Sequence, residues 1–251
     1  MHIDRPVVLS IGGHDPCAGA GLFADIKTFE QHKVYGLAVC SAITLQTESH
    51  FISVKWEPLK DILSAVEKML MHYEVRVVKI GIVENVAALS VIVSAINAIN
   101  KDIRIIVDPV IMSSTGFKFW NADIDIDKLI DILSGVYLLT PNCEEAKLIF
   151  PSDNEKRSAQ ELSMFCNILL KGGHNLQEPG ADYLFIKGDS QRIVSEPLTI
   201  HAKHGSGCVL SAAIASNLAL GFDLISSCRL AKNYIERFLS GNKTLLGYHH
   251  V

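Results

Sequence analysis

Short apolar runs rich in β-branched residues alternate along the chain with longer segments whose apolar residues recur every three or four positions. Residues 6–12 (PVVLSIG) are typical of a buried strand, and the segment over 19–33 has helical spacing up to Gly36. We predict further strands over 35–44, 75–81, 103–108, 136–140 and 167–172, and helices over 58–73, 84–100, 125–134, from 142, near 158–166 and over 206–220. Such alternation is typical of βαβ crossovers and predicts a mostly parallel sheet with helices on both faces.

One region departs from this alternation. Residues 181–200 contain two strand-like runs separated by GDS, and we predict that they form a hairpin appended to the sheet. The chain has 251 residues, of which 49% are hydrophobic, which fits one large α/β domain over residues 1–251 better than two separate domains.

Composition narrows the range of functions. A net charge of −4 gives no basic excess for binding nucleic acid or an anionic membrane. The N-terminal MHIDRPVVLSIGG lacks the features of a secretory signal, and no apolar run has the length of a membrane span, so we expect a cytoplasmic protein. Six scattered cysteines without a CxxC pair indicate reduced thiols rather than a zinc site or a disulfide framework.

Polar residues follow the predicted strands where each strand ends. In open α/β sheets, ligands bind beyond the carboxyl ends of the strands, so these residues are expected around one rim. They are Asp15, Asp25, Gln46, Asp108, Asn142, Glu145, Lys171 and Cys208. Carboxylates can hold hydrated magnesium and a lysine can offset phosphate charge, so the set suits the chemistry of nucleoside triphosphates.

The segment 203–221 (KHGSGCVLSAAIASNLALG) places two glycines and a cysteine at the start of a buried helix. Unpaired amides at a helix start favour anions, so Gly205 and Gly207 belong to a candidate phosphate or oxyanion cradle. Cys208 lies in the same field, which favours a thiolate and makes it a candidate base or nucleophile. The alternative is a glycine-rich turn capped by Ser206 with a core cysteine behind it.

Structural interpretations remain open for other residues of the set. Asp15 and Asp25 could be turn and helix-cap acids, and for Asp15 the structural and functional interpretations both stay open. Asn142 and Glu145 have the spacing of a capping box, which is compatible with a functional role. Gln46 could satisfy a strand end, and Lys171 could be a solvated charge.

Ordered motifs over nearly the whole chain resemble one known family. They are GGHDPCAGAGLFADIKTF, ITLQT, KIG, VDPV, TPNCEEA, LLKGGH and HGSGCVLSAAIASNLALG. Together they resemble the hydroxymethylpyrimidine/phosphomethylpyrimidine kinases of thiamin biosynthesis, in the ribokinase-like superfamily. The resemblance implies a three-layer α/β/α sandwich, ATP and Mg2+ as cofactors, and a homodimer. It also implies two phosphorylations, first of hydroxymethylpyrimidine and then of its monophosphate.

The resemblance also implies residue roles. Gln46 would read the ring nitrogen and amino group of the pyrimidine, with four residues around the ring: Gly13, Ala20, Ile82 and Val110. Asp108 and Glu145 would organise magnesium, with Asn142 beside them, and Lys171 would face the nucleotide phosphates. The implied anion hole consists of Gly205, Ser206, Gly207 and Cys208, in which Cys208 replaces the aspartate base of sugar-kinase relatives.

Some positions depart from the family pattern. Ser113 and Ser114 stand in a lid that usually carries a lysine, Ala202-Lys203 replaces Asn-Thr, and Ile82 replaces a methionine. Three alternatives remain: a pyridoxal kinase of the same superfamily, an oxidoreductase using GAGLFA (19–24) as a dinucleotide fingerprint, and a noncatalytic sensor of pyrimidine or nucleotide.

Overall fold

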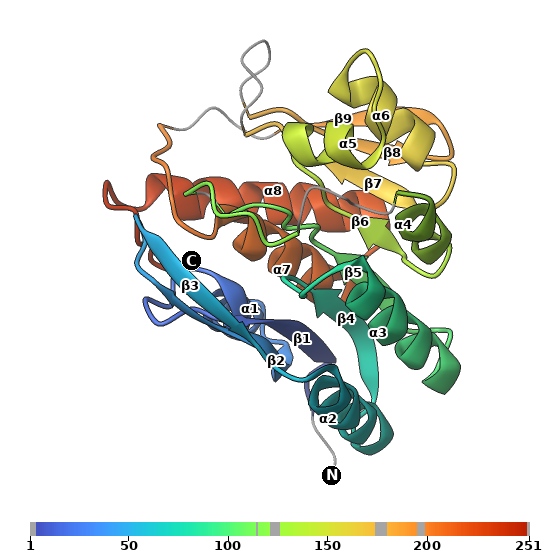
Figure 1. The fold of residues 1–251 in the computed structure, drawn as a ribbon. Coiled ribbons are helices and arrows are strands. Elements are labelled where there is room, and N and C mark those ends of the chain that lie inside the picture. The colour runs from blue at the N-terminus through green and yellow to red at the C-terminus, as the bar shows by residue number, and fades with distance from the viewer. Residues whose placement is uncertain (1–3, 114, 121–125, 174–179, 195–198, 250–251) are drawn as a thin grey trace.

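A nine-stranded sheet runs through the computed structural model, which describes residues 4–113, 115–120, 126–173, 180–194 and 199–249. The strand order is β3-β2-β1-β4-β5-β6-β7-β8-β9 (Figure 1). The parallel strands are β1 (Val7–His14), β2 (Tyr35–Gln46), β4 (Val75–Ile80), β5 (Arg104–Val107), β6 (Leu138–Leu139) and β7 (Asn167–Leu170). Antiparallel strands complete both edges: β3 (Phe51–Trp56) on one side, and β8 (Asp182–Ile186) and β9 (Asp189–Ile193) on the other.

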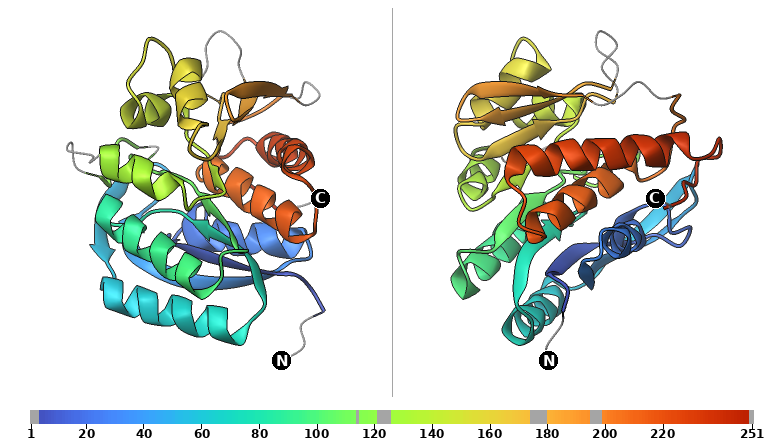
Figure 2. Two further views of the ribbon diagram at one scale, coloured as in Figure 1. Left: turned by 90° about the vertical axis from the view of Figure 1, so that its right-hand side faces the viewer. Right: turned by 180° about the vertical axis from the view of Figure 1, so that it is seen from behind.

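Helices cover both faces of the sheet (Figure 2). One layer contains α1 (Gly21–Gln31), α7 (Ser206–Ala219) and α8 (Leu224–Ser240). The other contains α2 (Leu59–His72), α3 (Val86–Ile99), α4 (Ile126–Leu133), α5 (Cys143–Ile149) and α6 (Glu155–Leu162). The predicted three-layer α/β/α sandwich with a mostly parallel sheet is therefore confirmed.

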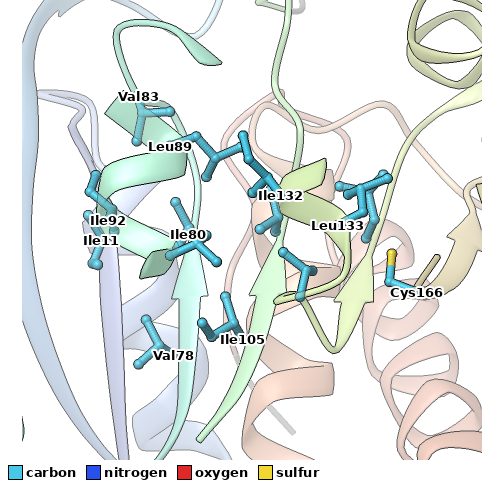
Figure 3. Close-up of a cluster of buried hydrophobic side chains, with 14 of the residues drawn as sticks. Ile11, Val78, Ile80, Val83, Leu89, Ile92, Ile105, Ile132, Leu133 and Cys166 are labelled. Carbon is cyan, nitrogen blue, oxygen red and sulfur yellow. The ribbon is translucent and has the colours of Figure 1, made fainter. Parts of the chain in front are cut away.

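Two apolar cores lie between the sheet and these layers. Successive strand residues point to opposite faces, so Ile105 belongs to the core under α3 and α4, whereas Ile106 belongs to the core under α7. Figure 3 shows the first of these cores, where Ile80 and Ile105 face Leu89 and Leu133. In the second core, every residue of α7 from 209 to 219 is buried. Among the helices of the described residues, none is long and apolar enough to cross a membrane.

The elements differ from the predicted set in four places. The strand β3 and the helix α8 were not among the predicted elements. The helix predicted near 158–166 begins earlier, because the Asn154 side chain accepts a hydrogen bond from the Arg157 amide and caps α6 there. Within the predicted hairpin the strands occupy 182–186 and 189–193, and residues 195–198 lie outside the described residues.

Candidate active site

Asp108 and Lys171 form a buried ion pair at the carboxyl ends of two parallel strands. Asp108 follows β5 and Lys171 follows β7, and Lys171 Nζ lies 2.7 Å from Asp108 Oδ1. Two hydroxyl groups also donate hydrogen bonds to the Asp108 carboxylate. Thr140 Oγ1 donates to Oδ1 at 3.3 Å, and Ser211 Oγ of α7 donates to Oδ2 at 3.3 Å. The two strand ends thus lie together as predicted, and α7 contacts them through Ser211.

Glu145 joins this pair from the first turn of α5. Its Oε2 lies 3.8 Å from Lys171 Nζ and accepts a 2.8 Å hydrogen bond from the Asn142 amide. In return, the Asn142 side chain accepts from the Glu145 amide at 2.8 Å, which completes a capping box. The structural and functional interpretations of these two residues are therefore compatible, because the cap holds the Glu145 carboxylate beside Lys171.

Opposite charges and burial shift the pKa values of this group in different directions. Burial alone would raise the pKa of Asp108, but Lys171 and Lys79 outweigh it and hold that pKa below its ordinary value. Burial also raises the pKa of Glu145, to about 7, although Lys171 opposes the rise. For Lys171, burial opposes the ammonium, but Asp108 and Glu145 raise its pKa above the ordinary range. The site therefore contains a permanent ion pair and one carboxyl that titrates near neutrality.

The start of α7 adjoins the ion pair. Gly205 precedes the helix with φ 75°, and a Cβ there would overlap the carbonyl oxygen of Gly19, so the position requires glycine. A Cβ on Gly207 would lie 3.4 Å from Lys171 Nζ and 3.7 Å from Asp108 Oδ2. The first amides of the helix therefore lie beside Lys171 and Asp108. These amides belong to Ser206, Gly207 and Cys208. This combination of amides and ammonium is suited to an anion.

The pKa of the Cys208 thiol differs from the prediction. The prediction that the helix start favours its thiolate is wrong for the protein without ligands: burial raises the pKa of the half-buried thiol to about 11. Lys79 and the Gly21 amide lower this pKa, whereas Asp25 and Asp108 raise it. Desolvation thus outweighs the positive charges around this thiol.

Asp15, Cys17 and His204 form a cluster that locks two loops together. The carboxylate of Asp15 accepts from the amides of Cys17, Gly19 and Ala20 at 2.8 to 3.1 Å, and His204 Nε2 lies 3.1 Å from Oδ2. Burial alone would raise the pKa of Asp15, but hydrogen bonds from His204, Cys17 and the backbone lower it to about 2. The turn interpretation of Asp15 is therefore confirmed. Its further effect is to attach loop 15–20 to the residue preceding Gly205.

Of the residues expected around the pyrimidine, Gly13, Ile82 and Gln46 lie near the end of β1. Gly13 lies against Ile82, because a Cβ on Gly13 would overlap the Ile82 side chain. Gln46 at the end of β2 is half-buried and donates to Thr44 Oγ1 at 3.0 Å, and Thr44 donates to the His14 carbonyl. Ala20 precedes α1, and the Val110 amide donates to the Asp108 carbonyl. Of the lid residues, Ser113 is described, whereas Ser114 lies outside the described residues.

Several polar residues of the site were not predicted from the sequence. His204 and Lys79 stand inside quoted motifs, HGSGC and KIG, but sequence position alone does not reveal their buried partners. Asp25 is not a helix cap, because it lies inside α1, fully buried and paired with Lys79. A lysine within an apolar strand is the signal that could have indicated this pair, since a buried ammonium requires a partner.

A mostly parallel sheet between two helical layers, with acidic residues and a helix start at the carboxyl ends of its strands, is the arrangement of kinases of ribokinase-like fold. The model of the phosphomethylpyrimidine kinase family matches residues 15–251, and the chain belongs to that family. A hydroxymethylpyrimidine/phosphomethylpyrimidine kinase of Rhizobium meliloti is 31% identical over 93% of this chain and 90% of its own length.

Solved structures agree with this assignment. A phosphomethylpyrimidine kinase of Clostridium difficile 630 matches with a TM-score of 0.76 and 32% identity, covering 92% of this chain and 98% of its own. A pyridoxal kinase of Staphylococcus aureus in complex with AMP-PCP and pyridoxal has a TM-score of 0.82 at 22% identity, over 97% of this chain and 92% of that one. At that identity the likeness shows the fold alone. The kinase family decides against the oxidoreductase interpretation of GAGLFA.

Proposed function

We propose that this chain transfers the γ-phosphoryl group of ATP to the hydroxymethyl group of hydroxymethylpyrimidine, and then phosphorylates the monophosphate to the diphosphate, in thiamin biosynthesis. The observation that carries the proposal is the placement of the α7 amides beside the Asp108–Lys171 pair, within a chain of this kinase family. Phosphoryl transfer relies mainly on positioning and on charge stabilisation, which such a site provides.

On the acceptor side, Gln46 binds the ring nitrogen and amino group of the pyrimidine. Gly13, Ala20, Ile82 and Val110 surround the ring. Gly13 and Ile82 lie side by side, because a Cβ on Gly13 would overlap the Ile82 side chain, and this allows both residues to border the same ring. The substrate hydroxymethyl group then points toward the start of α7.

In the transfer step, the Cys208 thiolate accepts the hydroxyl proton as the substrate oxygen forms its bond to the γ-phosphorus. The bond between that phosphorus and the bridging oxygen breaks, and its electron pair stays on ADP. Amides of Gly205, Ser206, Gly207 and Cys208 donate to the oxygens of the transferred group. Lys171 is close enough to the helix start to neutralise charge on the same oxygens.

On the nucleotide side, the described residues fit a hydrated magnesium ion. Mg2+ in such sites keeps several waters and takes one or two carboxylates together with phosphate oxygens. Asp108 and Glu145 supply two carboxylates, but both already contact Lys171, so they suit contact through water better than direct coordination. When bound, the ion would neutralise phosphate charge. Asn142 keeps Glu145 in place through the capping box.

The most direct test is mass-spectrometric analysis of the products from hydroxymethylpyrimidine and Mg-ATP. We expect the monophosphate first and the diphosphate later. Cys208→Ala should retain its fold and lose most of its turnover, with Cys166→Ala, a buried cysteine of α6–β7, as the control. Faster turnover of pyridoxal would favour the pyridoxal kinase alternative, and ADP production no higher than background would favour a sensor.

We also propose that the chain works in the cytoplasm as a homodimer. The family resemblance supports pairing, and exposed apolar side chains of β2 and β3, namely Ile43, Leu45 and Ile52, are compatible with a contact at that edge. Sedimentation velocity should give twice the mass of one chain. A monomer at all concentrations would contradict the proposed pairing without affecting the kinase proposal.

A further inference from the structure

Lys79 is a lysine buried in the middle of the protein. It lies in β4, where its side chain is 1% exposed. Transferring an ammonium out of water costs several kcal/mol unless close partners compensate. Its Nζ lies near the carboxyl end of the strand, because a Cβ on Gly81 would come within 3.4 Å of it. The charge is therefore held at the edge of the sheet where the site is built.

Asp25 is the partner of this lysine. Lys79 Nζ lies 2.8 Å from Asp25 Oδ2 and 3.0 Å from Oδ1, and Ser10 Oγ donates to Oδ2 at 2.6 Å. The group joins three elements, β4, α1 and β1. Stability alone is a weak reason for such a group, because apolar residues of similar volume often replace a buried ion pair without loss. The charges themselves are therefore candidates for a role in the site.

Cys208 lies on a helix that packs against the two elements of this pair. α7, which carries Cys208 in its first turn, packs against both α1 and β4, the elements of Asp25 and Lys79. The charged groups that act on Cys208 come from four sides: Lys79 of β4, Asp25 of α1, Asp108 after β5 and Lys171 after β7. Of these, Lys79 is the cation with the largest favourable effect on the thiolate.

We propose that Lys79 is a positioning residue that holds a fixed positive charge against the Cys208 thiolate, while Asp25 fixes the ammonium and sets how much of its charge the thiol experiences. This inference rests on the proposed function, in which Cys208 takes the substrate proton. Lys79 neither touches the substrate nor gives up its own proton. Its ammonium stays charged because Asp25, Cys208 and Asp108 raise its pKa against the effect of burial.

The two members of the pair should act on Cys208 with opposite signs. Removing the positive charge in Lys79→Met should raise the pKa of the thiol. Removing the negative charge in Asp25→Asn, which keeps the shape and one acceptor oxygen, should lower it. A purely structural role would disturb the site in the same direction in both variants.

The test measures the rate of alkylation of Cys208 by iodoacetamide as a function of pH, resolved from the other cysteines by peptide mass spectrometry. At pH 8 we expect the rate in Lys79→Met to fall at least about tenfold, which corresponds to one pKa unit. Asp25→Asn should alkylate faster than the unchanged protein, and Lys79→Arg should keep most of the rate. Lys232→Met is the matched control, because it removes another buried lysine, which is paired with Asp182 and Glu236 rather than with Asp25.

The outcomes separate this inference from the proposed function. Alkylation requires no substrate, so an absence of kinase turnover would leave this measurement intact. Equal rates in Lys79→Met and Lys232→Met, or shifts of the same sign in Lys79→Met and Asp25→Asn, would overturn the role of Lys79 even in an active kinase. If Lys79→Met does not fold, the other two variants still decide. A lower thiol pKa in Asp25→Asn and an unchanged thiol pKa in Lys79→Arg support the inference. A raised thiol pKa in either variant contradicts it.

Discussion

Opposing influences act on the pKa of the Cys208 thiol. It lies in the first turn of α7, with the Gly21 amide and Lys79 favouring its thiolate, yet burial raises its pKa to about 11. Position at a helix start is visible in the sequence, but desolvation is the sum over all neighbours in space. For this reason the location of Cys208 could be predicted, whereas the direction of its pKa shift could not.

This pKa predicts an unusual pH dependence. A general base must be deprotonated, and below pH 11 the thiolate fraction of the free protein grows about tenfold per pH unit. We therefore expect kcat/KM for hydroxymethylpyrimidine to rise with pH from 7 to 9. Cys208→Asp should retain partial activity and lose this rise, because its carboxylate is ionised at lower pH.

The control for this prediction is another buried cysteine. Burial raises the pKa of Cys166 to about 12, but Cys166 lies outside the site, so Cys166→Ala should keep the alkaline rise. The rise would be attributed to another group if Cys208→Asp retained it in full.

Short segments at strand ends bring the site together, and they differ in how visible they are in the sequence. Asp108, Asn142 and Lys171 follow apolar runs, so their meeting follows from parallel strands. The strand β3 lacks such a signal, because its residues FISVKW are exposed or half-buried throughout. The helix α8 did carry one: its buried residues include Leu224, Cys228, Ala231, Ile235 and Phe238, which have helical spacing after the Asp223 cap.

The N-terminal cap of α5 should affect both stability and the binding of Mg-ATP. Asn142→Ala should cost about 1 kcal/mol of stability, as a lost N-cap typically does, and should also free Glu145 to move away from Lys171. We expect a severalfold higher KM for Mg-ATP, measured in steady-state assays at several ATP concentrations. Asn85→Ala removes the equivalent cap of α3 and should lose similar stability while KM stays unchanged. A KM unaffected in both variants would contradict the role assigned to the capping box.

The glycine at the start of α7 should be important for stability. Gly205→Ala should place a Cβ into the Gly19 carbonyl in addition to the cost of about 1–2 kcal/mol for a left-handed alanine. Gly221→Ala, at φ 96° with open space around it, should carry only the conformational cost. Thermal unfolding should therefore show a larger fall in Tm for Gly205→Ala, and equal shifts would mean that the two loops separate easily.

At the level of the complete chain, one sheet supports both helical layers. Strand direction and crossover connections follow from the alternating apolar pattern, but the order β3-β2-β1-β4-β5-β6-β7-β8-β9 depends on which strand edges pair, and local sequence does not encode that. The alternating pattern already predicted helices on both faces of the sheet, and the family resemblance implied the same three layers.

The shared sheet predicts unfolding as a single unit. The crossovers of the described residues place their helices on one sheet that borders both cores, so we expect these residues to unfold together. Urea unfolding followed by tryptophan fluorescence, which reports on Trp56 and Trp120, should coincide with unfolding followed by far-UV circular dichroism. Two separated midpoints would instead indicate two domains.

The bond between Asp15 and His204 joins segments 189 residues apart. A ribosome therefore releases loop 15–20 long before His204, which anchors this loop, has left the exit tunnel. Domains tend to fold as units during synthesis, so a growing chain that stops before residue 204 has this loop without its anchor and without Cys208. Under the proposed function, we expect such a fragment to show no kinase turnover, because it lacks the proposed base.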